Sequence, residues 1–181
     1  MRTAHAVTTL CAVVANLALV AGFALPPRVV LAQDTVAAPS PENPLAGDAL
    51  ATARAAWKES DCISCHGWSG NGTETGPVPP GPSLRESALD YASAREIIQC
   101  GIPGGQMPSH DRMAYVDTRC YGLKSADLGS SKPLKGDSLK AADLDAVAAY
   151  VTGYLEGRGP ITPEECEEYF QGTNPNCGSY R

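Results

Sequence analysis

Cys62-Ile63-Ser64-Cys65-His66 is the stretch of this 181-residue chain that decides its fold. Two cysteines three positions apart lie on one turn of a helix, so both thiols can bond the vinyl groups of a single porphyrin. The histidine that follows directly then lies beneath the iron, where it serves as an axial ligand. The motif therefore predicts one covalently bound haem c, attached through Cys62 and Cys65 and ligated by His66.

Two other kinds of site use cysteines at this spacing. A thioredoxin-like redox pair needs no histidine at the next position and occurs in a βαβ context, which the sequence does not show. A zinc site needs a second ligand pair at similar spacing, which Cys100, Cys120, Cys166 and Cys177 do not supply. The pattern therefore favours haem attachment over both alternatives.

Helical patterns surround the motif, and no stretch has the alternation typical of a strand. Apolar spacing and capping residues predict helices over residues 49–59, 90–99 and 140–156, and a short one that starts at Thr162. In the first, Trp57 is the large apolar anchor and Asp48 is a suitable N-cap. The third carries one apolar stripe, made of Leu144, Val147, Val151 and Leu155. The sequence therefore predicts a small all-α domain with long loops.

The first 32 residues have the pattern of a secretory signal peptide. Arg2 and His5 precede an apolar run, and the small-residue site Val30-Leu31-Ala32 ends it. An uncleaved membrane anchor is the alternative, because the run is nearly long enough to span a bilayer. Residues 33–46, rich in Pro and Ala, predict a flexible tether. We therefore expect a periplasmic protein that contacts the membrane only if the N-terminal segment stays uncleaved.

The charge of the chain excludes one class of partner. The formal net charge is −6, and it becomes −8 once residues 1–32 are removed, because they contain Arg2 and Arg28 and no acid. An acidic protein repels nucleic acid and attracts partners with a basic surface. We therefore expect no nucleic-acid role, and we expect Asp111 and Asp117 to form part of an acidic contact rim.

Six cysteines remain after Cys11 leaves with the signal peptide, and four of them lie outside the haem motif. Two disulfides are the simplest account in an oxidising compartment, although four cysteines allow three connectivities. We favour Cys100–Cys120, which would clip the loop between them. The second pair, Cys166–Cys177, would then staple a C-terminal extension over residues 158–181.

The chain resembles a class I c-type cytochrome over residues 47–157. The matching pieces are the helix into the haem motif, Gly81-Pro82-Ser83-Leu84, Met107-Pro108 and the last long helix. The resemblance implies a small cytochrome c fold whose first and last helices cross, and single-electron transfer without a small-molecule substrate. It also implies that His66 donates to the carbonyl of Pro82, with Pro77 as the fallback, and that Pro82 and Leu84 belong to the haem pocket. The wide gap between His66 and Pro82 departs from compact members of the family.

Met107 is the favoured sixth ligand of the iron. Its loop is rich in glycine, which lets the backbone pass close to a porphyrin edge, and Pro108 stiffens the turn. A neutral thioether favours the ferrous state and raises the potential, as a carrier needs. Met113, His110 and an open site are the alternatives, and the polar surroundings of His110 suggest a solvated residue.

Two segments, CGIPGGQMP from Cys100 and ITPEECEEYF from Ile161, resemble the cytochromes that accompany quinoprotein methanol and other alcohol dehydrogenases. This resemblance implies a donor dehydrogenase of that class and a later cytochrome or terminal oxidase as acceptor. The leading hypothesis is therefore a diffusible electron carrier rather than an enzyme. The alternatives are a haem subunit fixed in a larger oxidoreductase complex, and a haem peroxidase or gas sensor with an open distal site.

Overall fold

The computed structural model describes residues 45–72 and 79–180, and within them the chain is helical without a strand. This confirms the all-α expectation. The α-helices are α1 (Gly47–Glu59), α2 (Cys62–His66), α3 (Tyr91–Cys100), α4 (Ser125–Leu128), α5 (Ala141–Tyr150) and α6 (Pro163–Phe170). A π-helix, η2 (Val151–Leu155), continues α5, and two short 3-10 helices are η1 (Gly129–Ser131) and η3 (Pro175–Ser179).

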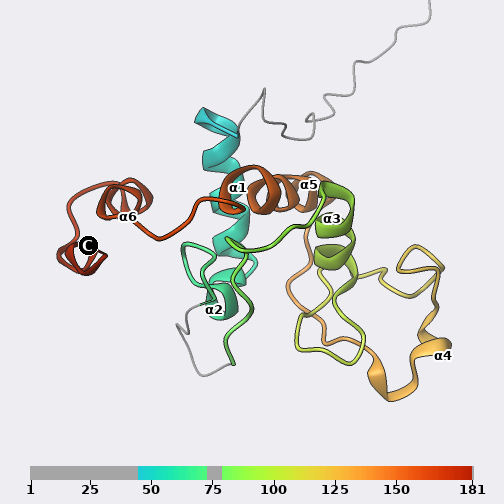
Figure 1. Ribbon diagram of the computed structural model, residues 1–181. Coiled ribbons are helices and arrows are strands. Elements are labelled where there is room, and N and C mark those ends of the chain that lie inside the picture. Colours follow the sequence, from blue (N-terminus) through green and yellow to red (C-terminus); the bar gives the residue numbers. More distant parts are fainter. Residues whose placement is uncertain (1–44, 73–78, 181) are drawn as a thin grey trace, which may run out of the picture. The chain divides into compact units, whose positions relative to one another are not determined.

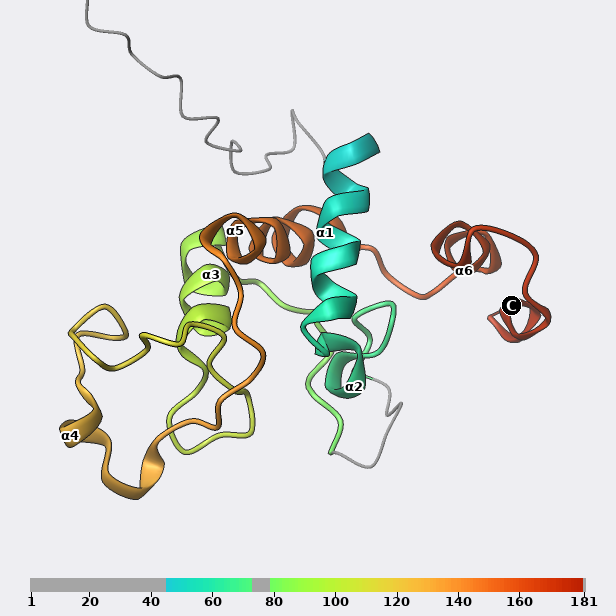
Figure 2. The same ribbon diagram turned by 180° about the vertical axis from the view of Figure 1, so that it is seen from behind.

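The core forms where α5 crosses α1, with α3 packed against the other part of α5 (Figures 1 and 2). The expected apolar stripe of the last long helix is buried, and it faces Trp57 of α1. Trp57 in turn meets the ring of Tyr150 edge-on, with 5.6 Å between ring centroids. Burial of these large rings contributes to the attraction between the two helices.

Helix ends follow local hydrogen-bonding chemistry, with two departures from expectation. The side chain of Asp90 caps α3 by accepting from the Ser93 amide, and Thr162 caps α6 through the Glu165 amide. Asp48 was expected to be an N-cap, but α1 begins at Gly47, two residues earlier than expected, and Asp48 lies in its first turn. The last long helix also changes to a π-helix at Val151 instead of continuing regularly to residue 156.

Both expected disulfides are present. Cys100 pairs with Cys120, and Cys166 pairs with Cys177, each with 5.5 Å between Cα atoms. Both pairs are fully buried, so each also contributes to packing. The second one joins α6 to η3, and thereby closes the C-terminal extension on itself.

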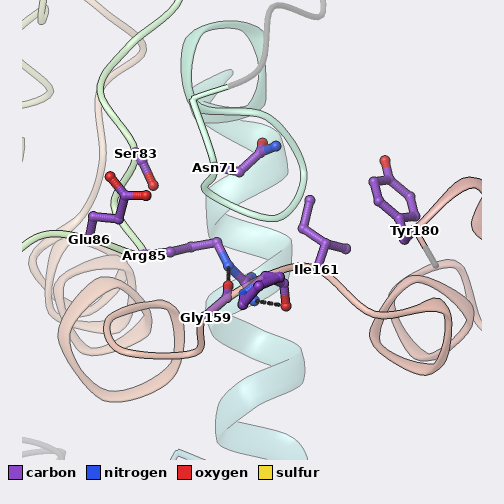
Figure 3. A pocket seen from close by; sticks show the side chains of 8 residues that line it. Asn71, Ser83, Arg85, Glu86, Gly159, Ile161 and Tyr180 are labelled. Carbon is purple, nitrogen blue, oxygen red and sulfur yellow. Dashed lines mark hydrogen bonds between the residues drawn. The ribbon is translucent and has the colours of Figure 1, made fainter.

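A buried ion pair holds that extension against the rest of the chain. Arg85 donates to both carboxylate oxygens of Glu165 in α6, at 2.8 and 2.9 Å, although the two residues are 80 positions apart. Its Nε donates to the carbonyl of Gly159 at 2.6 Å (Figure 3), and the same Nη1 and Nη2 also donate to the carbonyls of Ser69 and Pro160. The guanidinium is therefore fully paired, which a buried cation requires.

Aromatic side chains complete the attachment of the extension. Trp68 packs against Tyr169, with 5.0 Å between ring centroids, and its indole donates to the hydroxyl of Tyr180 at 3.3 Å. Lys58 lies over the ring of Tyr169. The extension is thus held by packing and charge as well as by its disulfide.

We predict that Glu165→Ala destabilises the protein by about 3–5 kcal/mol, because it leaves the buried Arg85 without its counterion. Chemical denaturation of the holoprotein measures this. Glu168→Ala is the matched control: it removes a neighbouring glutamate whose pair with Arg54 is exposed, so its effect should be much smaller. Equal losses in the two variants would contradict the structural role of the buried pair.

Candidate haem site

The haem motif forms a helix of its own, α2, directly after α1 (Figure 1). The two helices are joined through Asp61, whose left-handed backbone (φ 58°) turns the chain between them. Cys62 and His66 are buried, and Cys65 is half-buried. Among the described residues, Cys62 and Cys65 are the cysteines outside disulfides. The two thiols and the imidazole therefore share one helical turn, as haem attachment requires.

His66 is fixed by the carbonyl of Pro82, which lies 3.1 Å from its Nδ1. A carbonyl only accepts, so Nδ1 carries the proton and Nε2 keeps the lone pair that a metal needs. Burial lowers the pKa of His66, and the hydrogen bond to Pro82 opposes this effect. The ring is therefore neutral near pH 7, the form that ligates iron. This is the contact that the resemblance to class I cytochromes implies.

Two glycines allow the chain to return to His66. A Cβ on Gly81 would lie 2.7 Å from the His66 ring, and a Cβ on Gly72 would lie 2.5 Å from the carbonyl oxygen of Gly81. Gly72 also has a φ of +75°, which L side chains rarely adopt. Gly72 and Gly81 therefore lie close together in space, although they are separated in the long stretch of sequence between His66 and Pro82. Pro77, the fallback partner, lies outside the described residues.

The remaining predicted pocket residue of this stretch, Leu84, is buried in the main core cluster together with Cys62 and Trp57. Its amide donates to the carbonyl of Gly70 at 2.7 Å, which fixes the chain after Pro82. Trp57 also lies beside His66, with 5.9 Å between ring centroids. The core of the domain and the surroundings of the motif are thus one apolar cluster.

Met107, which follows α3 in the chain, packs against this same cluster. Its half-buried side chain packs against the core cluster, whereas Met113 is 42% exposed. Gly101 makes the turn possible: it has a φ of +67°, and a Cβ there would lie 2.7 Å from the carbonyl oxygen of Met107. That carbonyl accepts from the Ile102 amide at 3.1 Å. Of the two methionines, Met107 has the placement expected of a ligand.

His110 differs from the expectation of a solvated residue, which was wrong. It is 3% exposed, and its Nδ1 lies 2.8 Å from the carbonyl oxygen of Asp137. Its amide donates to the carbonyl of Ile98, and its own carbonyl accepts from the Leu139 amide. Little in the sequence indicates this burial. The neighbours of His110 in sequence are polar, and the residue that its ring packs against, Gly136, lies 26 positions further along the chain.

These residues fit a haem. The buried Cys62 is a neutral thiol, because burial raises its pKa to about 12, and it lies in the apolar cluster that a porphyrin edge would join. The indole Nε1 of Trp57 is buried and has no hydrogen-bond partner in the described part of the chain. Over residues 45–72 and 79–180, no three His, Cys, Asp or Glu side chains gather to hold a metal ion. A haem iron takes four bonds from the porphyrin and needs only two axial ligands.

A separate cavity of about 580 Å³ lies elsewhere in the domain (Figure 3). It is lined by Ser83, Arg85 and Glu86 and, from the C-terminal extension, by Gly159, Ile161 and Tyr180. The guanidinium of Arg85 already binds Glu165 and main-chain carbonyls, so it has no donor to offer a ligand. The cavity thus lies between the segment after Pro82 and the C-terminal extension, and Arg85 is not available to bind a ligand there.

The comparison with protein families agrees with this geometry. Residues 48–121 match the family described as cytochrome C oxidase, cbb3-type, subunit III. The matched residues run from α1 through the haem motif and the methionine loop to the first disulfide, and α5 and the extension lie beyond them. The match supports a class I c-type cytochrome domain that functions in electron transfer. No curated protein and no solved structure matches the chain.

We predict that Met107→Ala opens the iron of the haem-loaded protein to carbon monoxide and lowers its reduction potential by on the order of 0.1 V or more. The matched control, Met113→Ala, should do neither, because that side chain is largely exposed. Optical spectra under carbon monoxide and a redox titration measure both effects. If only Met113→Ala produced them, the sixth ligand would be Met113.

Proposed function

We propose that this protein is a periplasmic monohaem c-type cytochrome that carries single electrons between redox proteins. The observation that carries the proposal is His66, whose neutral ring is fixed by the Pro82 carbonyl beside two thiols outside disulfides. The family match over residues 48–121 supports the same class. Redox proteins are its partners, and no small-molecule substrate is required.

In this proposal the chain binds haem and controls its surroundings. Cys62 and Cys65 would hold it by thioether bonds, and His66 and Met107 would ligate its iron. When bound, the haem supplies a one-electron change between ferrous and ferric iron. Trp57 and Leu84 exclude water from the histidine side, and the thioether of Met107 favours the ferrous state. A methionine at this place also argues against a peroxidase or gas sensor, since both need an open distal position.

Export to the periplasm rests on three supports, which are the N-terminal sequence pattern, the two disulfides and the proposed haem attachment. The N-terminal pattern is that of a signal peptide, although residues 1–44 lie outside the described part of the chain. Two disulfides fit an oxidising compartment, and c-type haem attachment fits the same setting. No helix within residues 45–72 and 79–180 has the length and apolar character needed to cross a membrane.

The donor we propose is a quinoprotein methanol or other alcohol dehydrogenase, and the acceptor is a later cytochrome or terminal oxidase. Support comes from the two segments that resemble the cytochromes of such dehydrogenases, one in the methionine loop and one in α6. A second candidate function is a haem subunit fixed in a larger oxidoreductase. The matched family favours it, because its description is that of an oxidase subunit.

We predict that haem stays on the polypeptide after acid–acetone extraction, because thioether bonds survive that treatment while axial ligation does not. Expression with c-type maturation and an assay of one haem per chain measure this. Cys62→Ala/Cys65→Ala should lose the haem on extraction. The control Cys166→Ala/Cys177→Ala should keep it, because it removes two cysteines of the extension only. Complete extraction from the wild type would remove the central proposal.

We predict that osmotic shock releases the haem-bearing chain in soluble form, as a diffusible carrier requires. The released ferric protein, mixed with a pyrroloquinoline-quinone alcohol dehydrogenase and its alcohol, should become ferrous. The same mixture without alcohol is the control. If the haem-bearing chain were recovered only as part of a membrane complex, the second candidate function, a fixed haem subunit, would be favoured. If the dehydrogenase did not reduce the ferric protein, this class of donor would be excluded.

A further inference from the structure

The surface around the methionine loop differs in charge from the rest of the chain. Residues 101–136 contain five basic residues and three acidic ones, a formal charge of +2 in a chain of −6. The basic residues are Arg112, Arg119, Lys124, Lys132 and Lys135, and the acidic ones are Asp111, Asp117 and Asp127. A positive region in an acidic molecule creates a dipole, which orients the molecule as it approaches a charged partner.

Two of the three acids of this region, Asp111 and Asp117, are already paired, which weakens the acidic rim that the sequence suggested. Arg119 binds Asp117 at 2.8 Å and Asp111 at 3.2 Å. Asp111 also accepts from Gln99 and from the amide of Met113. The hydrogen bonds from Arg119 lower the pKa of Asp117 to about 2. One arginine therefore offsets half of the formal negative charge of the two carboxylates.

Several of the basic residues have no such counterion. Arg112, Lys132 and Lys135 are exposed, and none of them forms an ion pair with a described residue. The ammonium of Lys132 donates only to the hydroxyl of Ser125, at 2.7 Å. These cations thus keep their full charge for a partner.

Two of them, Lys132 and Lys135, lie beside the methionine loop. The loop is joined to residues 131–136 by three backbone hydrogen bonds: Gly104 N–H to Ser131, Ser109 N–H to Leu134 and Gly136 N–H to Ser109, at 2.7 to 3.0 Å. Figure 1 shows these segments together beyond the end of α3. The lysines therefore flank the segment that carries Met107.

Exposed apolar side chains lie on the same two segments. Ile102 is 44% exposed, and Leu134 is 63% exposed. The amide of Ile102 donates a hydrogen bond to the carbonyl of Met107. This surface residue is therefore in direct contact with the backbone of Met107, the proposed iron ligand. We call Ile102, Leu134, Lys132 and Lys135 the methionine-loop face. Small apolar contacts with charged surroundings are typical of brief redox encounters.

We infer that the methionine-loop face is the docking surface for an acidic redox partner, one that presents carboxylates around an apolar centre. The inference rests on the proposed function, because Met107 must ligate a haem for an electron to cross here. The cations attract the partner's carboxylates, while the acidic remainder of the chain repels them and so selects this face. The Cys100–Cys120 disulfide holds the loop between its ends, which reduces the entropy cost of docking.

Oxidation of the ferrous holoprotein by two small reagents of opposite charge tests the sign of this face. Hexacyanoferrate(III) and tris(phenanthroline)cobalt(III) each accept one electron from the haem iron. The rate with the anion should fall as ionic strength rises, and the rate with the cation should rise, despite the net negative charge of the protein. Lys135→Glu should lower the low-salt rate with hexacyanoferrate(III) by up to about tenfold. Lys58→Glu, the same change on α1, should have little effect.

A polymer of glutamate tests the kind of partner. Added to the isotope-labelled ferrous protein, poly-L-glutamate should shift the amide signals of Ile102, Leu134 and Lys135 in NMR spectra. The shifts should be lost in Lys132→Glu/Lys135→Glu and kept in Lys58→Glu. A rate with the anion that rises with salt, or shifts confined to other residues, would overturn the docking surface alone. A chain that binds no haem would overturn this inference together with the proposed function.

Discussion

The hydrogen bond between the His66 ring and the Pro82 carbonyl sets the geometry on which the rest of the site depends. It fixes which nitrogen carries the proton, and it requires the chain to return to the haem motif after a long excursion. Gly72 and Gly81 make that return possible, because side chains there would collide with the backbone or with the imidazole. Once the return is made, the amide bond from Leu84 to Gly70 places Leu84 in the core. Ligand orientation and chain path are therefore one constraint.

The same cluster serves packing and chemistry. Trp57 contacts the ring of Tyr150 where α1 crosses α5, and it also contacts the ring of His66. It therefore belongs both to the hydrophobic core and to the site. Because interiors are close-packed, a change at the helix crossing is transmitted to the histidine. The C-terminal extension is attached differently, through the buried pair of Arg85 and Glu165.

Local features were predictable from the sequence, and long-range ones were not. The helix of the motif, the buried stripe of the last long helix and both disulfide pairings follow from spacing or short loops. The burial of His110 depends on Gly136 and Asp137, and the partner of Arg85 lies 80 positions away, so no local pattern marks either one. The acidic rim was expected from net charge alone, whereas the outcome depends on a single arginine, Arg119, between Asp111 and Asp117.

The methionine loop is tied down at several points: by the disulfide at Cys100, by the backbone bonds to residues 131–136, and by the buried ring of His110. An electron moves only when the nuclei around donor and acceptor reach a common geometry, and the energy needed for this is the reorganisation energy. In the proposed haem protein, a loop fixed in this way would let the sulfur of Met107 shift little when the iron changes its charge. Surroundings that are already arranged need not rearrange at the moment of reaction. In the proposed carrier, the crosslinks that stabilise this domain would thereby also lower the barrier to electron exchange.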